Sequence, residues 1–103
     1  MKALFIVMFL FFSQHICAQH ISGTILNEEG KPLTNATVSL LLAKDSSVQK
    51  SATTDELGNF RFSEIKHNNY IVSATAVGYN AGYSAGFNFN GTDQNLPTLV
   101  LSK

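Results

Sequence analysis

The sequence predicts an all-β protein, a seven-stranded antiparallel β-sandwich that follows a cleaved signal peptide. Three observations lead to this fold class. Apolar and polar residues alternate with a period of two through much of residues 20–101. Turn-forming Gly, Asn, Asp and Pro residues interrupt the alternation roughly every ten residues. No stretch of this region has apolar residues at the spacing of an amphipathic helix. Several short strands in one small domain favour two stacked sheets.

The first 18 residues have the composition of a secretory signal peptide. Lys2 gives a positive start, residues 3–12 are an uninterrupted apolar run, and Ala18 is a small residue at the expected cleavage site. The apolar run is shorter than the roughly 18 residues that a membrane-spanning helix needs. We therefore expect cleavage after Ala18 and a single exported domain at residues 19–103.

The only cysteine of the chain, Cys17, lies within this leader. Lipid anchoring at Cys17 is the alternative to cleavage after Ala18, but a lipoprotein signal has a small residue directly before the cysteine, where this chain has Ile16. Removal of the leader leaves a domain whose stability cannot come from a disulfide. A cysteine-free exported domain fits a bacterial periplasm or cell surface better than a small eukaryotic secreted scaffold.

The charge of the chain is balanced, with seven basic and seven acidic side chains. Such a chain lacks the basic field that attracts nucleic acid or anionic lipid. We therefore expect no nucleic-acid partner.

The predicted elements follow in order from residue 20. Seven strands are expected, at residues 20–26, 36–43, 48–54, 59–63, 70–77, 83–89 and 96–101. The third is mostly polar and suits a sheet edge, as does Pro97 near the start of the last. The sixth has the clearest alternation, which places Tyr83 in one row with Phe87 and Phe89. Ile65 is expected to enter the core from a loop.

The turn between the third and fourth predicted strands is the most informative stretch. Asp55 can accept hydrogen bonds from backbone N–H groups that follow it, and Gly58 can supply the positive φ that a tight turn needs. Alternation then places Phe60 and Phe62 together on the core side, with the residues between and beside them facing solvent. This stretch is predicted to fix two aromatic rings in the core.

Several short motifs follow one another along the chain, each occurring once. They are Ile21-Ser-Gly23-Thr-Ile25, Glu29-Gly30, Pro32-Leu33, Ala36-Thr-Val38, Thr54-Asp55-Glu-Leu-Gly58-Asn-Phe60, Tyr70-Ile-Val72 and Gly78-Tyr79. Together they resemble the carboxypeptidase regulatory-like domain, a transthyretin-like (prealbumin-like) β-sandwich. The resemblance covers residues 20–80 by motif and the remainder by strand pattern only. It implies structural roles for Gly23, Gly30, Pro32, Asp55, Gly58, Phe60, Tyr70, Gly78 and Tyr79.

The resemblance also implies a cellular context. Such domains commonly follow the signal peptide of TonB-dependent receptors and other outer-membrane β-barrel proteins of Bacteroidetes-type bacteria. The expected function is thus a non-catalytic accessory module, either the N-terminal domain of such a protein, a fragment from one, or a domain used alone. Its partners would be outer-membrane or periplasmic proteins, reached by surface contact or by pairing along the third or last strand. Membrane contact would come only through an attached barrel.

The sequence offers little for catalysis or metal binding. His20 and His67 are too few for a zinc site, and no serine lies in a Gly-x-Ser-x-Gly motif. We therefore expect no catalytic residue, no metal site and no cofactor. Calcium binding by Asp55, Glu56 and Asn59 is an alternative, but turn capping accounts for Asp55 without a metal.

The alternative function is a free-standing carbohydrate-binding module, because the same fold class includes such modules. Tyr79 and Tyr83 are the candidate residues for stacking on a sugar ring. The competing interpretation is that Tyr79 packs over a strand end and that Tyr83 faces the core. The chain contains no Trp, the side chain best suited to stacking. Asn35 and Asn90 begin N-glycosylation sequons, which matter only in a eukaryotic secretory pathway.

Overall fold

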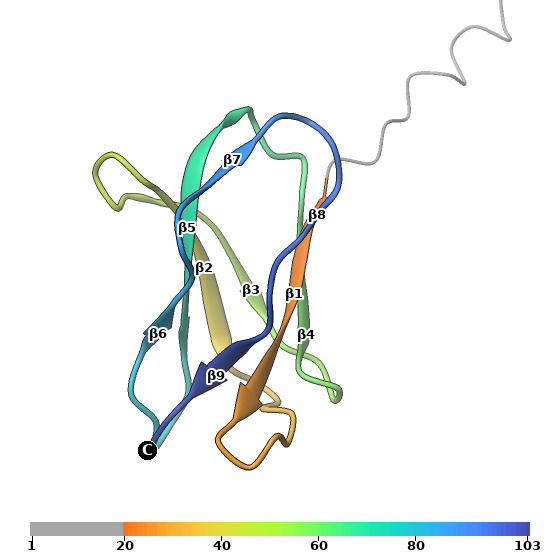
Figure 1. Cartoon of the computed structure of the whole chain (residues 1–103), viewed down its shortest axis with the longest axis vertical. Helices are drawn as coiled ribbons and strands as arrows, with labels where there is room; N and C mark the ends of the chain where they lie inside the picture. Colours follow the sequence, from red (N-terminus) through yellow and green to blue (C-terminus); the bar gives the residue numbers. More distant parts are fainter. Residues whose placement is uncertain (1–19) are drawn as a thin grey trace, which may run out of the picture.

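The computed structural model describes residues 20–103, so the predicted signal peptide and Cys17 lie outside the described residues. The described part consists of short strands joined by turns (Figure 1). Its nine strands are β1 (His20–Asn27), β2 (Thr37–Leu42), β3 (Val48–Thr53), β4 (Asn59–Ser63), β5 (Asn68–Thr75), β6 (Gly82–Tyr83), β7 (Phe87–Phe89), β8 (Gln94–Asn95) and β9 (Leu99–Leu101). Among residues 20–103, no helix has the length and hydropathy to cross a membrane.

The strands form two facing sheets, so the predicted all-β sandwich is confirmed. One sheet has the order β4-β1-β8, with β9 also paired to β1, and the other has the order β3-β2-β5-β6, with β7 also paired to β5. There are nine strands instead of seven. The sixth predicted strand is divided into β6 and β7, the seventh is shortened to β9, and β8 lies before the range predicted for the seventh.

The last two strands depart from the predicted antiparallel arrangement. β8 and β9 both pair with β1 in parallel. The chain leaves β7 at the end of the sandwich where β1 starts, and crosses there to the other sheet (Figure 1). It must therefore run beside β1 in the same direction. Pro97 lies between β8 and β9, where neither strand needs its missing N–H.

The core lies between the sheets and is built from alternate residues of the long strands. Phe60 and Phe62 are 5% and 2% exposed, with ring centroids 5.7 Å apart, which confirms their predicted placement. Ile65 is buried, as predicted, and the positive φ of 58° at Glu64 directs the chain so that Ile65 enters the core. The largest fully buried side chains are Phe89, Ile21, Ile25, Leu40, Leu101, Val38 and Val72.

β3 is an edge strand, as predicted. Its Lys50 lies opposite the fully buried Leu40, on the inner side of the sheet. The Lys50 ammonium donates a hydrogen bond to the carbonyl oxygen of Ser63, at 2.6 Å, and so joins β3 to the end of β4. An inward-facing charge on an edge strand opposes pairing with another chain. Pairing of a partner along β3 is therefore disfavoured.

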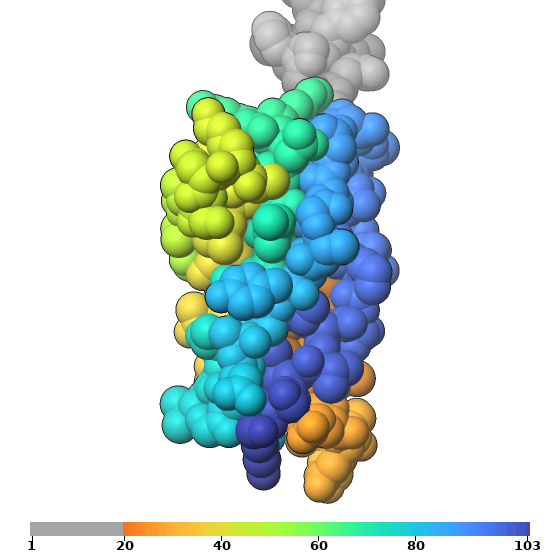
Figure 2. Space-filling view, turned by 60° about the vertical axis from the view of Figure 1, so that its left-hand side comes forward, coloured from red at the N-terminus to blue at the C-terminus, as the bar shows by residue number. Residues whose placement is uncertain are grey.

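The C-terminal residues close the sandwich on the side where β6 lies. Figure 2 shows the segment that contains β6 lying beside the last strand. The Asn80 N–H donates to the carbonyl oxygen of Ser102 at 2.7 Å, which joins the two sheets at this end. The last strand is thus occupied by β1 on one side and contacts the β6 segment on the other. Edge pairing along β9 is disfavoured as well.

A bulge divides the sixth predicted strand. Tyr83 pairs with Ser73, whereas Phe87 pairs with Tyr70, so the β6–β7 side contains one residue more than β5 over the same distance. An extra residue of this kind is a β-bulge, which exchanges the faces of the residues on either side. The prediction that Tyr83 shares the core-facing row of Phe87 is therefore wrong, and Tyr83 is 64% exposed.

Ser84 holds the bulge in place. Its N–H donates to the carbonyl oxygen of Val72 at 2.8 Å, and its hydroxyl accepts the N–H of Val72 at 2.9 Å. The hydroxyl thus replaces the carbonyl group that a regular ladder would offer. β5 also begins two residues earlier than predicted, because Asn68 and Asn69 pair with β7.

Candidate functional site

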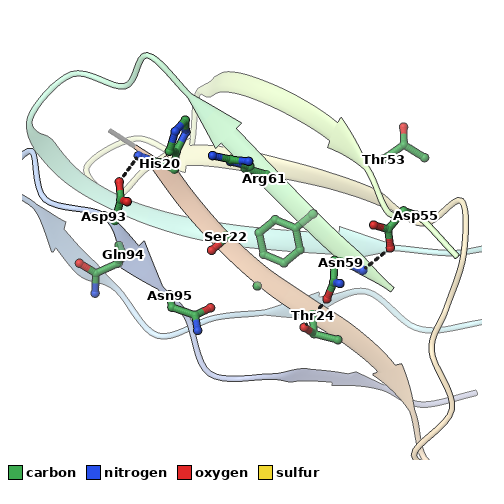
Figure 3. A pocket seen from close by; sticks show the side chains of 12 residues that line it. His20, Ser22, Thr24, Thr53, Asp55, Asn59, Arg61, Asp93, Gln94 and Asn95 are labelled. Atoms are coloured by element: carbon green, nitrogen blue, oxygen red, sulfur yellow. Dashed lines mark hydrogen bonds between the residues drawn. The ribbon is translucent and has the colours of Figure 1, made fainter. Parts of the chain in front are cut away.

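A shallow groove of about 770 Å³ lies over the outer face of the β4-β1-β8 sheet (Figure 3). Alternate residues of β1 and β4 point to this side, because their neighbours point into the core. Hydroxyl, amide and guanidinium groups therefore gather on one face of a regular ladder. The polar side chains along its middle are Ser22, Thr24, Asn59, Arg61, Gln94 and Asn95, and its ends are lined by His20, Thr53, Asp55 and Asp93.

The centre of the groove is set by the pairing of β1 with β4. Ser22 lies opposite Arg61, and Thr24 lies opposite Asn59. The Thr24 hydroxyl donates to the side-chain oxygen of Asn59 at 2.8 Å, which fixes the orientation of the amide (Figure 3). The amide nitrogen of Asn59 and the exposed guanidinium of Arg61 are donors along the groove. This part of the site can bind hydroxyl, carbonyl or carboxylate oxygens.

Asp93 and His20 form one end of the groove. The backbone N–H of His20 donates to the Asp93 carboxylate at 3.0 Å, which attaches the loop after β7 to the start of β1 (Figure 3). The imidazole Nδ1 of His20 lies 3.0 Å from the hydroxyl oxygen of Ser63. Both contacts hold β1 against its neighbours at the end of the sheet.

The turn before β4 forms the other end. One Asp55 carboxylate oxygen accepts the N–H groups of Leu57 and Asn59, each at 2.9 Å, so the predicted capping role of Asp55 is confirmed. Gly58 has a φ of 78°, as predicted. A Cβ at Gly58 would lie 2.5 Å from the carbonyl oxygen of Ile25 and 3.1 Å from the Cβ of Pro32. The turn therefore needs glycine both for its conformation and for its close packing on β1 and on the loop that follows it.

The floor of the groove depends on Gly23. In the β1–β4 ladder Gly23 lies opposite Phe60, and a Cβ at Gly23 would lie 2.7 Å from the Cζ of that ring. A side chain at Gly23 would displace the ring from the core. The ring itself is only 5% exposed, so it offers no flat surface on which a ligand could stack.

The other motif residues serve turns and packing. Gly30 and Gly78 have φ values of 80° and 87° in turns, and Pro32 forms a bridge with Leu26. Tyr70 is buried, and its hydroxyl donates to the carbonyl oxygen of Lys66 at 2.6 Å. Burial raises the pKa of Tyr70 above its ordinary value, because the phenolate would lose its hydration.

Neither Tyr79 nor Tyr83 lines the groove. Tyr79 is partly buried against the core, and the ammonium of Lys103 lies 5.7 Å from the centre of its ring. Tyr83 lies on the outer face of the other sheet, opposite Ser73. Of the two candidate stacking residues, only Tyr83 presents a largely free ring.

The two histidines within residues 20–103 have separate neighbours. His67 packs edge-on against Phe89, with ring centroids 6.3 Å apart, whereas His20 contacts Ser63 and Asp93. Within residues 20–103, no group of three or more His, Cys, Asp or Glu side chains is placed to hold a metal ion.

Sequence reasoning missed two features. Thr54 is 3% exposed, and its hydroxyl accepts the N–H of Ala36 at 2.9 Å and donates to the carbonyl oxygen of Leu33 at 2.6 Å. A threonine directly before a capping aspartate gives no sequence signal for this role. The groove was also missed, although the polar positions between the core residues of β1 and β4 could have indicated it.

The fold and the groove define a small all-β sandwich domain with a polar outer sheet face. The family model described as "Carboxypeptidase regulatory-like domain" matches residues 20–102, and the chain belongs to this family. The family resemblance predicted from the motifs is confirmed. No match to the sequence was found among curated proteins.

Similar solved structures support the same fold. The chain is similar to the Bacillus anthracis TIE protein (TM-score 0.66, 18% identity, 84% of this chain and 17% of that one). It is also similar to chlorocatechol 1,2-dioxygenase from Pseudomonas putida (TM-score 0.62, 11% identity, 84% of this chain and 61% of that one). A third similar structure is a chain of a type II cohesin–X-dockerin complex from Acetivibrio cellulolyticus (TM-score 0.62, 22% identity, 81% of this chain and 56% of that one). The present chain thus spans between 17% and 61% of the length of these proteins.

Proposed function

We propose that this domain is a non-catalytic interaction module that binds a protein partner through the groove on the β4-β1-β8 sheet. The observation that carries the proposal is the row of hydroxyl, amide and guanidinium groups on one rigid sheet face. Such a face can bind a polar protein surface without ordering a loop, which lowers the entropic cost of binding. The two strands predicted to pair with a partner, β3 and β9, are poorly suited to strand addition.

Ser63 and His20 are the residues that come nearest to a catalytic pair. A working pair needs a third group that orients the imidazole and donors that stabilise an oxyanion. Asp93 accepts the backbone N–H of His20 and does not orient the ring. We therefore assign the contact to stabilising the start of β1. Esterase and peptidase assays should show no activity that a Ser63→Ala variant loses.

A photo-crosslinking amino acid at Arg61 tests the partner surface in the producing bacterium. Position 61 lies in the groove, whereas Thr75, on the outer face of the other sheet, is an exposed control position. We expect a discrete crosslinked protein from position 61 and none from position 75. Equal crosslinking from both positions, or none from either, would contradict the proposal.

The cellular context that we propose is the N-terminal region of a TonB-dependent receptor or a related β-barrel protein, at the outer membrane or in the periplasm of a Gram-negative bacterium. The signal-peptide composition of residues 1–18 and the family of the domain support this context. Sequencing the DNA downstream of the codon for Lys103 tests it. An in-frame plug and barrel would support the receptor, and an unrelated neighbouring gene after a stop codon would count against it.

Carbohydrate binding is a second candidate, favoured by the exposed ring of Tyr83. Titration with a glycan panel tests it, with Tyr83→Ala to remove the ring and Tyr83→Phe to retain it. Binding that survives in Tyr83→Phe and disappears in Tyr83→Ala would support stacking. Absence of binding at about millimolar glycan, the weak end of ordinary recognition, would reject this candidate.

A further inference from the structure

We propose that Asn90-Gly91 is a self-modification site, at which the fold accelerates conversion of Asn90 to aspartate and isoaspartate. The site lies in the short loop between β7 and β8, and the Asn90 side chain is exposed to the water that the reaction requires. Three neighbouring groups supply the chemistry: the Gly91 backbone nitrogen, the His67 imidazole and the two donors of Thr92.

The Asn90 side-chain carbonyl is activated by Thr92. Its oxygen accepts the Thr92 hydroxyl at 2.5 Å and the Thr92 N–H at 3.3 Å. Two donors on one carbonyl oxygen withdraw electron density from the carbon and stabilise the oxyanion that forms when a nucleophile attacks. Both donors bind the oxygen, so neither holds the –NH₂ group, which has to leave.

Gly91 supplies a nucleophile without a side chain of its own, near a base. The backbone nitrogen of Gly91 follows Asn90 directly, and ring closure onto the side-chain carbon gives a five-membered succinimide. A Cβ at Gly91 would lie 2.6 Å from the Nε2 of His67, so the imidazole covers the space that a side chain would fill. An imidazole in this position can take the amide proton through one bridging water. The edge contact with the fully buried Phe89 holds the His67 ring there.

The reaction balances without an added reagent other than water. The Gly91 N–H proton passes through a bridging water to His67, the nitrogen bonds to the Asn90 side-chain carbon, and the bond from that carbon to –NH₂ breaks. Ammonia leaves with the proton returned by His67. Water then opens the succinimide at either carbonyl group, which gives aspartate or isoaspartate at position 90.

The modification would alter the end of the groove. It adds a negative charge three residues before Asp93, which accepts the N–H of His20. The isoaspartyl product also lengthens the backbone of the loop by one methylene group. We expect the contact between the loop and β1 to weaken in the modified protein.

The first test compares the folded and the denatured full chain. Purified protein is incubated at neutral pH with and without guanidinium chloride, and deamidation at each asparagine is followed by peptide mass spectrometry. We expect Asn90 to react at least about tenfold faster in the folded chain. This acceleration is smaller than the one that a positioned general base typically contributes. Asn35, which is exposed and precedes Ala36, is the internal control and should show no such acceleration. An Asn90 rate that is equal or slower in the folded chain would overturn the proposal.

Two sets of variants then separate the roles. His67→Gln removes the base, and Thr92→Val removes the hydroxyl donor, whereas Thr92→Ser keeps that donor. We expect the first two to bring the folded-state rate near the denatured rate, and Thr92→Ser to stay near the wild-type rate. Circular dichroism confirms that each variant is folded. Wild-type rates in folded His67→Gln would refute the role of His67, and equal rates in Thr92→Val and Thr92→Ser would refute that of the hydroxyl.

Discussion

Strands β1 to β5 and strands β6 to β9 build the same sandwich with ladders of different length. β1 pairs with β4 over five consecutive residues, and β2 pairs with β5 over six. β6 and β8 each pair over two residues, and β7 and β9 each pair over three. The first group therefore forms long ladders, with one register shift between β2 and β3 at Leu40 and Leu41. The second group covers the edges of these ladders in short pieces.

The difference shows what fixes the direction of a side chain in this fold. In a long ladder successive side chains point to opposite faces of the sheet. One buried residue therefore determines which other residues of the strand are buried and which are exposed. Between β6 and β7 the bulge at Ser84 inserts one residue, and the direction changes from Tyr83 to Phe87. Buried and exposed positions in the second group thus depend on local hydrogen bonds as well as on alternation.

The largest expected effect tests the long-ladder region. Phe60→Ala should lower the free energy of unfolding by about 3–5 kcal/mol, because it removes a buried ring and leaves a cavity. Arg61→Ala, one residue further and exposed, should change it by less than about 0.5 kcal/mol. Chemical denaturation of both variants measures the contrast. Similar losses in the two would show that β4 does not have a distinct buried face.

The sequence predicted this region well because local pattern and tertiary structure agree in it. The alternation in β1, β2, β4 and β5, the Asp55 cap and the Gly58 conformation each follow from residues that are close together in the chain. The parallel pairing of β8 and β9 with β1 joins residues about seventy positions apart. The alternation of a short strand does not encode the direction of a distant partner.

The next effect tests the bulge. Ser84→Ala should lower the free energy of unfolding by about 1–3 kcal/mol, because it leaves the partly buried N–H of Val72 without an acceptor. Ser84→Thr retains the hydroxyl and should be closer to the wild type. Ser73→Ala, at a neighbouring position of β5, is a control for removal of a hydroxyl. A Ser84→Ala effect no larger than that of Ser73→Ala would mean that the hydroxyl does not hold the bulge.

A smaller effect involves Tyr70, which pairs with Leu42 of β2 and with Phe87 of β7 and so belongs to both regions. Burial raises its pKa in the folded state, so the unfolded chain releases this proton first as pH rises through the ordinary value of 10.0. The wild-type stability should therefore fall above that pH more steeply than the stability of Tyr70→Phe.

Denaturation of both proteins between about pH 7 and pH 11 measures the difference. At neutral pH the variant should be less stable by about 1 kcal/mol, because it lacks the hydrogen bond to the carbonyl oxygen of Lys66. This gap should narrow above pH 10. A constant gap over the whole range would show that the Tyr70 phenol ionises equally in both states.

The groove could be predicted from the sequence only in part. Ser22, Thr24, Asn59 and Arg61 follow from the alternation of β1 and β4, which also predicted the core. Asp93, Gln94 and Asn95 reach the same face through the crossing after β7, which no local pattern indicates. The site therefore combines a half that alternation predicts and a half that depends on topology.

The smallest expected effect is at Tyr83, where the two regions meet. Because the bulge turns this ring to solvent, Tyr83→Ala should change the free energy of unfolding by less than about 0.5 kcal/mol. Unbroken alternation from Phe89 would instead place the ring in the core, and the same substitution would then cost about 3–5 kcal/mol. Phe89→Ala, fully buried in the next strand, provides that larger value in the same assay. A loss at Tyr83 near that of Phe89 would show that the ladder continues through Ser84 without a bulge.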